Sequence, residues 1–181
     1  QFFEQYKSKG LVRAKAKLTD EMWAKYLYHP DEDRFVGNIY AAVYMAVGMM
    51  KSGEHKQYNL KRKERRDLAT DQAMFSKVFT YVMQVLSVPP NIEIFFRPEQ
   101  QGELQVANCR EKLQFIPSIV VGGGMLSGRS DKDMAFPIAS FLTKMRPEHY
   151  LRQIIPTNTE LSVAVMAAIR MVAPQFNIPP D

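Results

Sequence analysis

Ser140 and Lys144 stand one helical turn apart, and their types and spacing could do chemistry. On a helix, side chains four positions apart lie on the same face. A lysine amine that accepts the proton of a serine hydroxyl creates a nucleophile for hydrolysis. No other feature of the sequence supplies an oxyanion site. We therefore interpret the pair as a small serine and an exposed lysine, with a hydrolytic dyad as the alternative.

Histidine could supply metal ligands, but His29, His55 and His149 are scattered and make no pair at helical spacing. A set of metal ligands made of His149, Glu148 and Glu160 is conceivable. However, Pro147 should break the helix just before the first two of these residues. We expect no metal and no cofactor, and we interpret Arg146, Glu148 and His149 as a polar network at the end of a helix.

A basic run, KRKERR, is the densest charge cluster in a chain of net charge +5. Such a cluster could contact phosphate or an acidic surface. No aromatic interleaving, glycine-rich loop or known nucleic-acid module accompanies it. We interpret the run as a solvated face and keep binding of nucleic acid or acidic surfaces as an alternative. The basic residues of the run are Lys61, Arg62, Lys63, Arg65 and Arg66.

The composition is that of a folded domain. Of the 181 residues, 46% are apolar and 24% are charged, which is enough apolar material for a core. The single cysteine, Cys109, excludes an internal disulfide and fits a reducing compartment, so we expect a cytoplasmic protein. No apolar run reaches the ~20 residues of a membrane span. Because the chain begins with Gln1, we expect a fragment of a longer protein.

The N-terminal half has helical patterns. Thr19 and Asp20 are plausible caps before EMWAKYLYH, in which apolar residues recur at helical spacing. A second helix is predicted over Arg34–Met50, and Leu60–Leu86 should contain a third. Adjacent prolines at 89 and 90 end the third helix, since proline cannot continue it.

The pattern changes after these prolines. Three segments, Ile92–Phe96, Glu103–Asn108 and Phe115–Val121, are rich in β-branched and aromatic residues or alternate in polarity. They predict a small, mostly antiparallel three-stranded sheet. Gly122–Gly124 then allows the chain to bend or to approach another backbone closely.

Two more helices follow the sheet. Ser130 is a good N-cap with Asp133 three residues on, which predicts a helix over Asp131–Met145 with Pro137 inside it. A last helix is predicted over Glu160–Val172, with Thr159 as its N-cap. Helices, a short sheet and more helices in separate blocks indicate an α+β fold.

The stretch from residue 120 to 144 resembles the minimal gluzincin metallopeptidases of the HtpX type. In that family a strand ends in a small-residue turn, and a Ser-x-x-Glu-Leu step then opens the catalytic helix. Here the turn is Gly122–Gly124, Met125 and Leu126 follow it, and the opening is Ser130 with Asp133–Met134. The resemblance implies a zincin-like arrangement, in which the helix after the sheet is the former active-site helix.

The resemblance also places the zinc motif of the family, His-Glu-x-x-His, on Ser140, Phe141 and Lys144. A hydroxyl, a phenyl ring and an ammonium group cannot replace two imidazoles as zinc ligands. Phe141 has no basic atom, so it cannot activate water. The implied protein is a catalytically inactive metallopeptidase-like domain, with a hydrolase that uses other ligands or the Ser-Lys dyad as the alternative.

Over residues 19–172 the chain is similar to degenerate peptidase-like regions that follow tetratricopeptide repeats in large bacterial proteins. The phrases EMWAKYLYHPDED, LKRKERRDLATDQ and FLTKMRPEHYL carry this similarity. It implies a linker or the end of an upstream helical region at 1–18, the domain at 19–173 and a loose tail at 174–181. The implied partner is a protein or peptide, including the upstream repeats of the same chain.

The expected interaction surface is the substrate cleft that such peptidases use. They take extended peptides by strand addition at a sheet edge, a geometry that does not need the metal. The strand before the glycine turn and the helix after it should form this cleft, with the basic run as a second candidate surface. The predicted residues are Ser118, Val120, Gly122, Ser140 and Lys144, together with Lys61, Arg62, Lys63, Arg65 and Arg66.

Overall fold

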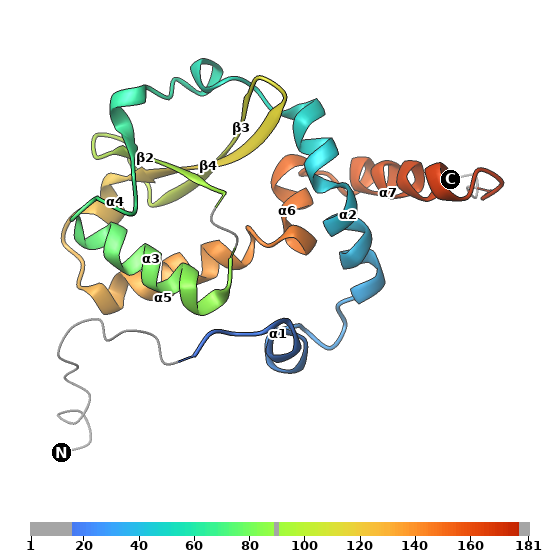
Figure 1. Ribbon diagram of the computed structural model, residues 1–181, viewed down its shortest axis with the longest axis horizontal. Coiled ribbons are helices and arrows are strands. Elements are labelled where there is room, and N and C mark those ends of the chain that lie inside the picture. Colours follow the sequence, from blue (N-terminus) through green and yellow to red (C-terminus); the bar gives the residue numbers. More distant parts are fainter. Residues whose placement is uncertain (1–15, 89–90, 178–181) are drawn as a thin grey trace.

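The computed structural model describes residues 16–88 and 91–177, so most of the predicted linker at 1–18 and the end of the tail at 174–181 lie outside the described residues. Figure 1 shows a mixed arrangement of helices around a small sheet. In chain order the elements are α1 (Asp20–Tyr26), α2 (Arg34–Lys51), the 3-10 helices η1 (His55–Tyr58) and η2 (Arg62–Glu64), β1 (Arg65–Arg66), α3 (Met74–Leu86), β2 (Glu93–Arg97), β3 (Leu104–Glu111), β4 (Gln114–Gly122), α4 (Gly123–Leu126), α5 (Asp131–Thr143), α6 (Pro147–Ile154) and α7 (Asn158–Val172).

The α+β class is confirmed, but the sheet has four strands in the order β1-β2-β4-β3. β1 and β3 run antiparallel to their neighbours, whereas β2 and β4 are parallel. The three predicted segments form β2, β3 and β4, and two of the three pairings are antiparallel, but the predicted number of strands was wrong. The added strand is only Arg65–Arg66, and its two exposed charges carry no strand pattern. Because β4 returns between β2 and β3, it is an inner strand.

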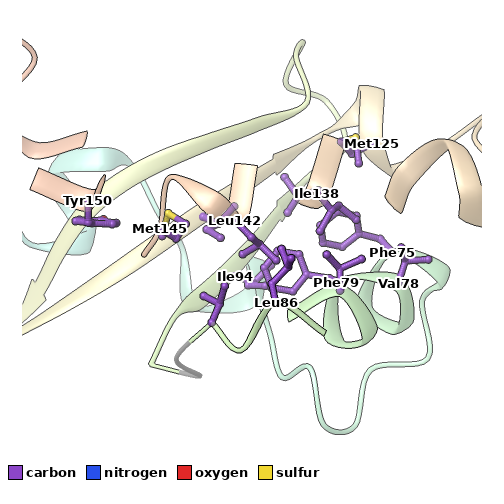
Figure 2. Close-up of a cluster of buried hydrophobic side chains, with 14 of the residues drawn as sticks. Phe75, Val78, Phe79, Leu86, Ile94, Met125, Ile138, Leu142, Met145 and Tyr150 are labelled. Atoms are coloured by element: carbon purple, nitrogen blue, oxygen red, sulfur yellow. The ribbon is translucent and has the colours of Figure 1, made fainter. Parts of the chain in front are cut away.

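One face of the sheet carries the main core. α3 and α5 pack on each other there, and Figure 1 shows them together on one side of the strands. Figure 2 shows side chains of this core, which come from α3, β2, α4, α5, the segment after α5, and α6. Full burial of a side chain of this size is worth about 1.5–3 kcal/mol. The labelled residues are Phe75, Val78, Phe79, Leu86, Ile94, Met125, Ile138, Leu142, Met145 and Tyr150.

The other face of the sheet has a smaller apolar cluster of Leu60, Phe95, Ala107, Cys109 and Val120. The chain before α3 lies on this side, because Leu60 is anchored in the cluster and β1 pairs with β2. The helix predicted within Leu60–Leu86 is α3, which occupies only the second half of that range. Exposed charges from 61 to 66 provide no apolar stripe, so that segment forms η2 and β1, and the helix begins only at Met74.

Several helix ends follow the local chemistry. α2 is confirmed, with Asp33 as its N-cap: the Asp33 carboxylate accepts from the Phe35 backbone N–H at 2.8 Å. Two helices were not predicted, the single turn α4 and α6, and α6 begins at Pro147. Proline suits the first position of a helix because the missing N–H has no partner there anyway. α7 begins at Asn158, with Thr157 and not Thr159 as the N-cap.

Helices α2 and α7 lie at one end of the molecule. Figure 1 shows α7 projecting away from the sheet and its covering helices, beside α2. An ion pair between Lys51 Nζ and Glu160 Oε1, 3.0 Å long, joins the end of α2 to the start of α7. Within the described ranges, none of the helices combines the length and the apolar character that crossing a membrane requires.

Candidate functional site

The first turn of α5 is organised as a capping box, as predicted. Ser130 Oγ accepts from the Asp133 backbone N–H at 3.3 Å, and the Ser130 backbone N–H donates to Asp133 Oδ2 at 3.4 Å. Hydrogen bonds from the Ser130 hydroxyl and backbone hold the pKa of the Asp133 carboxyl below its ordinary value. The helix continues through Pro137 and ends at Thr143. Local hydrogen bonds therefore fix where α5 starts, and the start of the helix determines on which side of it Ser140, Phe141 and Lys144 lie.

The three positions that the resemblance matched to the zinc motif do not form a site with one another. Ser140 and Lys144 are exposed, and Phe141 is half-buried against the main core. In the described part of the chain, no hydrogen bond joins the Ser140 hydroxyl to the Lys144 amine. Lys144 is the C-cap residue of α5, and its backbone N–H donates to the carbonyl of Phe141. The geometry thus gives neither an activated serine nor a set of metal ligands.

A polar network lies directly after α5 and was predicted in part. The Arg146 side chain is only 9% exposed, and its Nε donates to Glu148 Oε1 at 2.5 Å. Its Nη2 donates to Asp20 Oδ1 at 3.0 Å, and the guanidinium lies over the Trp23 ring, 4.4 Å from the centroid. These contacts join the start of α6 to α1, more than 100 residues earlier in the chain. The Arg146 cation is a structural link between the two helices.

Glu148 also accepts a hydrogen bond from the Tyr28 hydroxyl at 2.6 Å. Burial alone would raise the pKa of Glu148, but the hydrogen bonds from Tyr28 and Arg146 outweigh it and hold the pKa below its ordinary value. Burial, followed by the neighbouring Glu148 carboxylate, raises the pKa of Tyr28 to about 12. The two groups therefore favour a charged carboxylate and a neutral phenol at neutral pH.

His149 does not turn toward the carboxylates proposed as co-ligands. Its Nε2 lies 3.2 Å from Glu32 Oε1, and its ring stacks on Tyr28 with 5.9 Å between centroids. Glu160 is instead paired with Lys51 at the start of α7. Across residues 16–88 and 91–177, no group of three or more histidine, cysteine, aspartate and glutamate side chains is arranged so that it could hold a metal ion.

The predicted strand of the interaction surface is not accessible. Ser118, Val120 and Gly122 lie on β4, which pairs with β2 on one side and with β3 on the other. All three residues are buried. They therefore cannot form part of a docking surface, because their backbone groups and side chains already have neighbours inside the sheet. The order of the strands, which no local pattern encodes, decides this outcome.

The basic run is exposed but partly neutralised by its own neighbours. Arg65 Nη1 lies 2.9 Å from Glu93 Oε1, and Glu64 Oε2 lies 3.0 Å from Arg97 Nε. The Arg66 guanidinium is stacked over the Phe96 ring at 5.4 Å. Lys61, Arg62 and Lys63 are exposed at the surface. The run lies at the β1 edge of the sheet, where Arg65 is paired with Phe95 and Arg66 with Ile94 of β2.

Glu93, which the sequence analysis missed, lies next to this run. Its side chain is 9% exposed, and its Oε2 is 2.6 Å from His55 Nε2. With the Arg65 ion pair, the carboxylate is held from two sides at the wall of a pocket of about 450 Å³. The only sequence signal is a single acid between apolar residues at the start of a strand. Because both oxygens are engaged, Glu93 is built as a structural anchor and not as a free base.

The sheet has two edge strands, β1 and β3; β1 is only two residues long, so the longer edge is that of β3. Gly53 bridges part of its outer side: the Gly53 N–H donates to the Asn108 carbonyl at 3.0 Å, and the Arg110 N–H donates to the Gly53 carbonyl at 2.8 Å. The backbone of an antiparallel strand alternates its direction with a period of two. Leu104 and Val106 therefore direct their N–H and C=O groups to the same outer side, and beyond the pairing with β4 no backbone hydrogen bond of the described residues reaches them.

Comparison with protein-family models, with curated proteins and with solved structures found no match to this chain.

Proposed function

We propose that the chain is a catalytically inactive, metallopeptidase-like domain that acts as a protein-interaction or scaffold module and binds an extended peptide segment along β3. The observation that carries the proposal is the open outer edge of β3 at Leu104 and Val106. Unpaired strand edges are templates for pairing with another chain. The edge strand is β3 and not β4, so the proposed surface moves by one strand from the one that the sequence indicated.

The size of the open edge sets the expected strength of binding. Leu104 and Val106 offer two N–H and two C=O groups, which are enough for four backbone hydrogen bonds. At about 1 kcal/mol net for each bond, the backbone supplies roughly 4 kcal/mol, which corresponds to millimolar affinity. Tighter binding requires side-chain contacts. The half-buried side chains of Leu104 and Val106 and the exposed Gln105 are the available surfaces for them.

The absence of catalysis is the second part of the proposal. It rests on the match of Ser140, Phe141 and Lys144 to the zinc motif and on the chemistry of these side chains. The hydrolase alternative needs Lys144 to activate Ser140, and the lack of a hydrogen bond between them in the described chain speaks against it. The nucleic-acid alternative relies on a basic run in which Arg65 is already paired with Glu93.

A peptide-display library panned against the 181-residue chain tests the interaction. We expect the selected peptides to alternate apolar and polar residues and to lose binding to the variant Val106→Pro. This change removes an outward N–H without touching the bonds to β4. The matched control, Val106→Ala, keeps the N–H and should retain most of the affinity. Peptides that bind Val106→Pro as well as they bind the parent chain would refute the site.

Two further measurements complete the test. Hydrogen exchange should show new protection of the Leu104 and Val106 amides when a selected peptide is bound, and no comparable change at other exposed amides. Elemental analysis for zinc and a peptidase assay test the catalytic part. One zinc held per chain, or peptide cleavage that Ser140→Ala abolishes, would overturn the proposal of an inactive domain.

A further inference from the structure

Helix α2 is apolar on all sides but largely uncovered. No charged residue occurs between Arg34 and Lys51, yet Gly48 is the only buried residue in the whole helix. A helix that is hydrophobic all round normally lies inside a protein. Among the described residues, α6 and the sheet cover one side of α2, and the C-terminal part of α7 flanks part of the other side, where Ile39 is half-buried. The rest of this other side of α2 is an exposed apolar surface of the kind that marks an interaction site.

The covered side of α2 faces α6 and the sheet. Gly48 lies against the Phe115 ring, and the Tyr44 ring lies 6.0 Å from that of Tyr150. Each residue of an α-helix is rotated by about 100° from the one before it. The residues at 35, 39, 42, 46 and 50 therefore lie on the side of α2 opposite to Tyr44 and Gly48. On that side Phe35 is 70% exposed and Met50 is 83% exposed.

The outward side has a definite pattern, which we call the α2 stripe: Phe35, Ile39, Ala42, Ala46 and Met50. The steps of four and three residues at its start are those of helices that pack lengthwise on one another. The side chains at the two ends of the α2 stripe are large, and those at its centre are small. Two alanines at the centre allow another helix to approach closely.

Helix α7 extends this apolar surface. A groove of about 440 Å³, lined only by apolar residues, lies between α2 and the C-terminal part of α7. At its rim Met171 is 78% exposed and Val172 is 87% exposed. A polar or charged partner would find no complementary group in this groove. The occupant must offer an uncharged helical surface.

We propose that a second copy of this chain covers the α2 stripe, with the two α2 helices antiparallel about a twofold axis. The axis passes between positions 42 and 43. Phe35 then lies opposite Met50 of the partner subunit, and Ile39 lies opposite Ala46 of the partner subunit. A large side chain therefore meets a small one on each side of the axis, which makes the α2 stripe complementary to itself, as a twofold interface requires.

The charges at the ends of α2 fit the same arrangement. Antiparallel pairing brings Arg34 of one copy to the end of α2 that carries the Lys51–Glu160 ion pair in the other. The Glu160 carboxylate, 49% exposed, offers the arginine an opposite charge there. The dimer joins two chains of net charge +5, so salt should screen their repulsion and tighten the association.

The size of the surface sets the expected affinity. The 18-residue helix α2 is about 27 Å long, and α2 together with the adjacent α7 presents a surface roughly 20 Å wide. The contact is therefore on the order of 500 Å² per copy, below the ~800 Å² of standard stable interfaces. We expect a dimer with a dissociation constant in the micromolar range, so that it dissociates on dilution.

Sedimentation equilibrium of the 181-residue chain between about 1 and 200 µM tests the proposal. We expect a monomer–dimer equilibrium that shifts toward the dimer at higher salt. Ala46→Glu should weaken the dimer at least tenfold, because it places a charge at the centre of the α2 stripe. The control is Leu113→Glu at a 90% exposed position of the β3–β4 turn, which should leave the equilibrium unchanged. Circular dichroism establishes that both variants are folded.

Cross-linking tests the orientation independently of any loss of stability. Ala42→Cys lies next to the twofold axis and should form an intermolecular disulfide under mild oxidation, whereas Leu113→Cys should not. A chain that stays monomeric at 200 µM, a dimer that Ala46→Glu leaves intact, or the absence of the cross-link at position 42 would each overturn the proposal. Val106→Pro should leave the dimer unchanged, so the test is separate from that of the peptide site.

Discussion

Gly48 of α2 lies directly against the Phe115 ring of β4, and replacing it by alanine tests this packing. A Cβ atom at position 48 would lie 2.5 Å from Cδ1 of Phe115 and 2.6 Å from its Cε1. The ring cannot move away easily, because Phe115 is fully buried and packs edge-on against Tyr150, with 5.8 Å between centroids. Overpacking of this kind costs about 1–3 kcal/mol.

The same substitution also favours the helix, since alanine is about 1 kcal/mol better than glycine in a helix interior. Because the new Cβ would overlap two ring atoms and the ring is fully buried, we take the cost of the clash as about 3 kcal/mol, the upper end of that range. After the helix gain of about 1 kcal/mol, we expect Gly48→Ala to lower the free energy of unfolding by about 2 kcal/mol. For a chain of this length, that corresponds to a fall in melting temperature of roughly 4–8 °C.

Gly37 provides the matched control in the same helix. A Cβ atom there would meet only Glu148 Cβ, at the ordinary contact distance of 3.5 Å. Gly37→Ala should therefore gain the helix preference without the clash and stabilise the fold by up to about 1 kcal/mol. Urea unfolding at 1 µM, followed by the fluorescence of the single tryptophan, measures both variants. If Gly48→Ala were as stable as Gly37→Ala, α2 would not pack on Phe115 as described.

Two further outcomes are expected. Because the pKa of Tyr28 is raised to about 12 in the folded chain, its neutral form contributes stability that is complete below pH 10 and is lost as the pH rises from 10 to 12. Tyr28→Phe should reduce this alkaline decline and cost about 1 kcal/mol at pH 7, measured as unfolding free energy against pH; an unchanged alkaline slope would contradict the raised pKa of Tyr28. Ser130→Ala should cost about 1 kcal/mol through the lost N-cap of α5, whereas Ser130→Asp should cost little. Equal losses for the two variants, in the same denaturation assay, would show that the cap contributes nothing.

Local patterns predicted those elements that local chemistry decides. The helix at α2 and the cap at Ser130 follow from apolar spacing and from a hydroxyl with an acid three residues on. β1 could not be predicted, because two exposed arginines become a strand only when β2 lies beside them. α6 was missed because Pro147 was taken only as the end of one helix, although proline also suits the start of the next.

The candidate site was harder to predict, since it depends on contacts between distant parts of the chain. The pairing of Arg146 with Glu148 is local and was anticipated as a polar network. Its partners Asp20 and Tyr28 lie about 120 residues away, and no spacing rule reaches them. For the same reason β4 was taken for the strand beside the cleft: the order of strands in a sheet is a property of the tertiary structure.

Cys109 makes the opening of β3 measurable without any mutation. The thiol lies in the middle of this edge strand, is fully buried on the second face of the sheet, and has its pKa raised by burial. A thiol reagent can therefore modify the folded chain only when the packing between β3 and the residues that cover this face, such as Leu60, opens. The rate of modification then measures how often this part of the chain unfolds locally. The dependence of that rate on denaturant concentration distinguishes local opening from unfolding of the whole chain. A peptide that binds along β3 should lower the rate of modification. The Cys109 sulfur therefore reports both the local stability of β3 and the binding of a peptide to it.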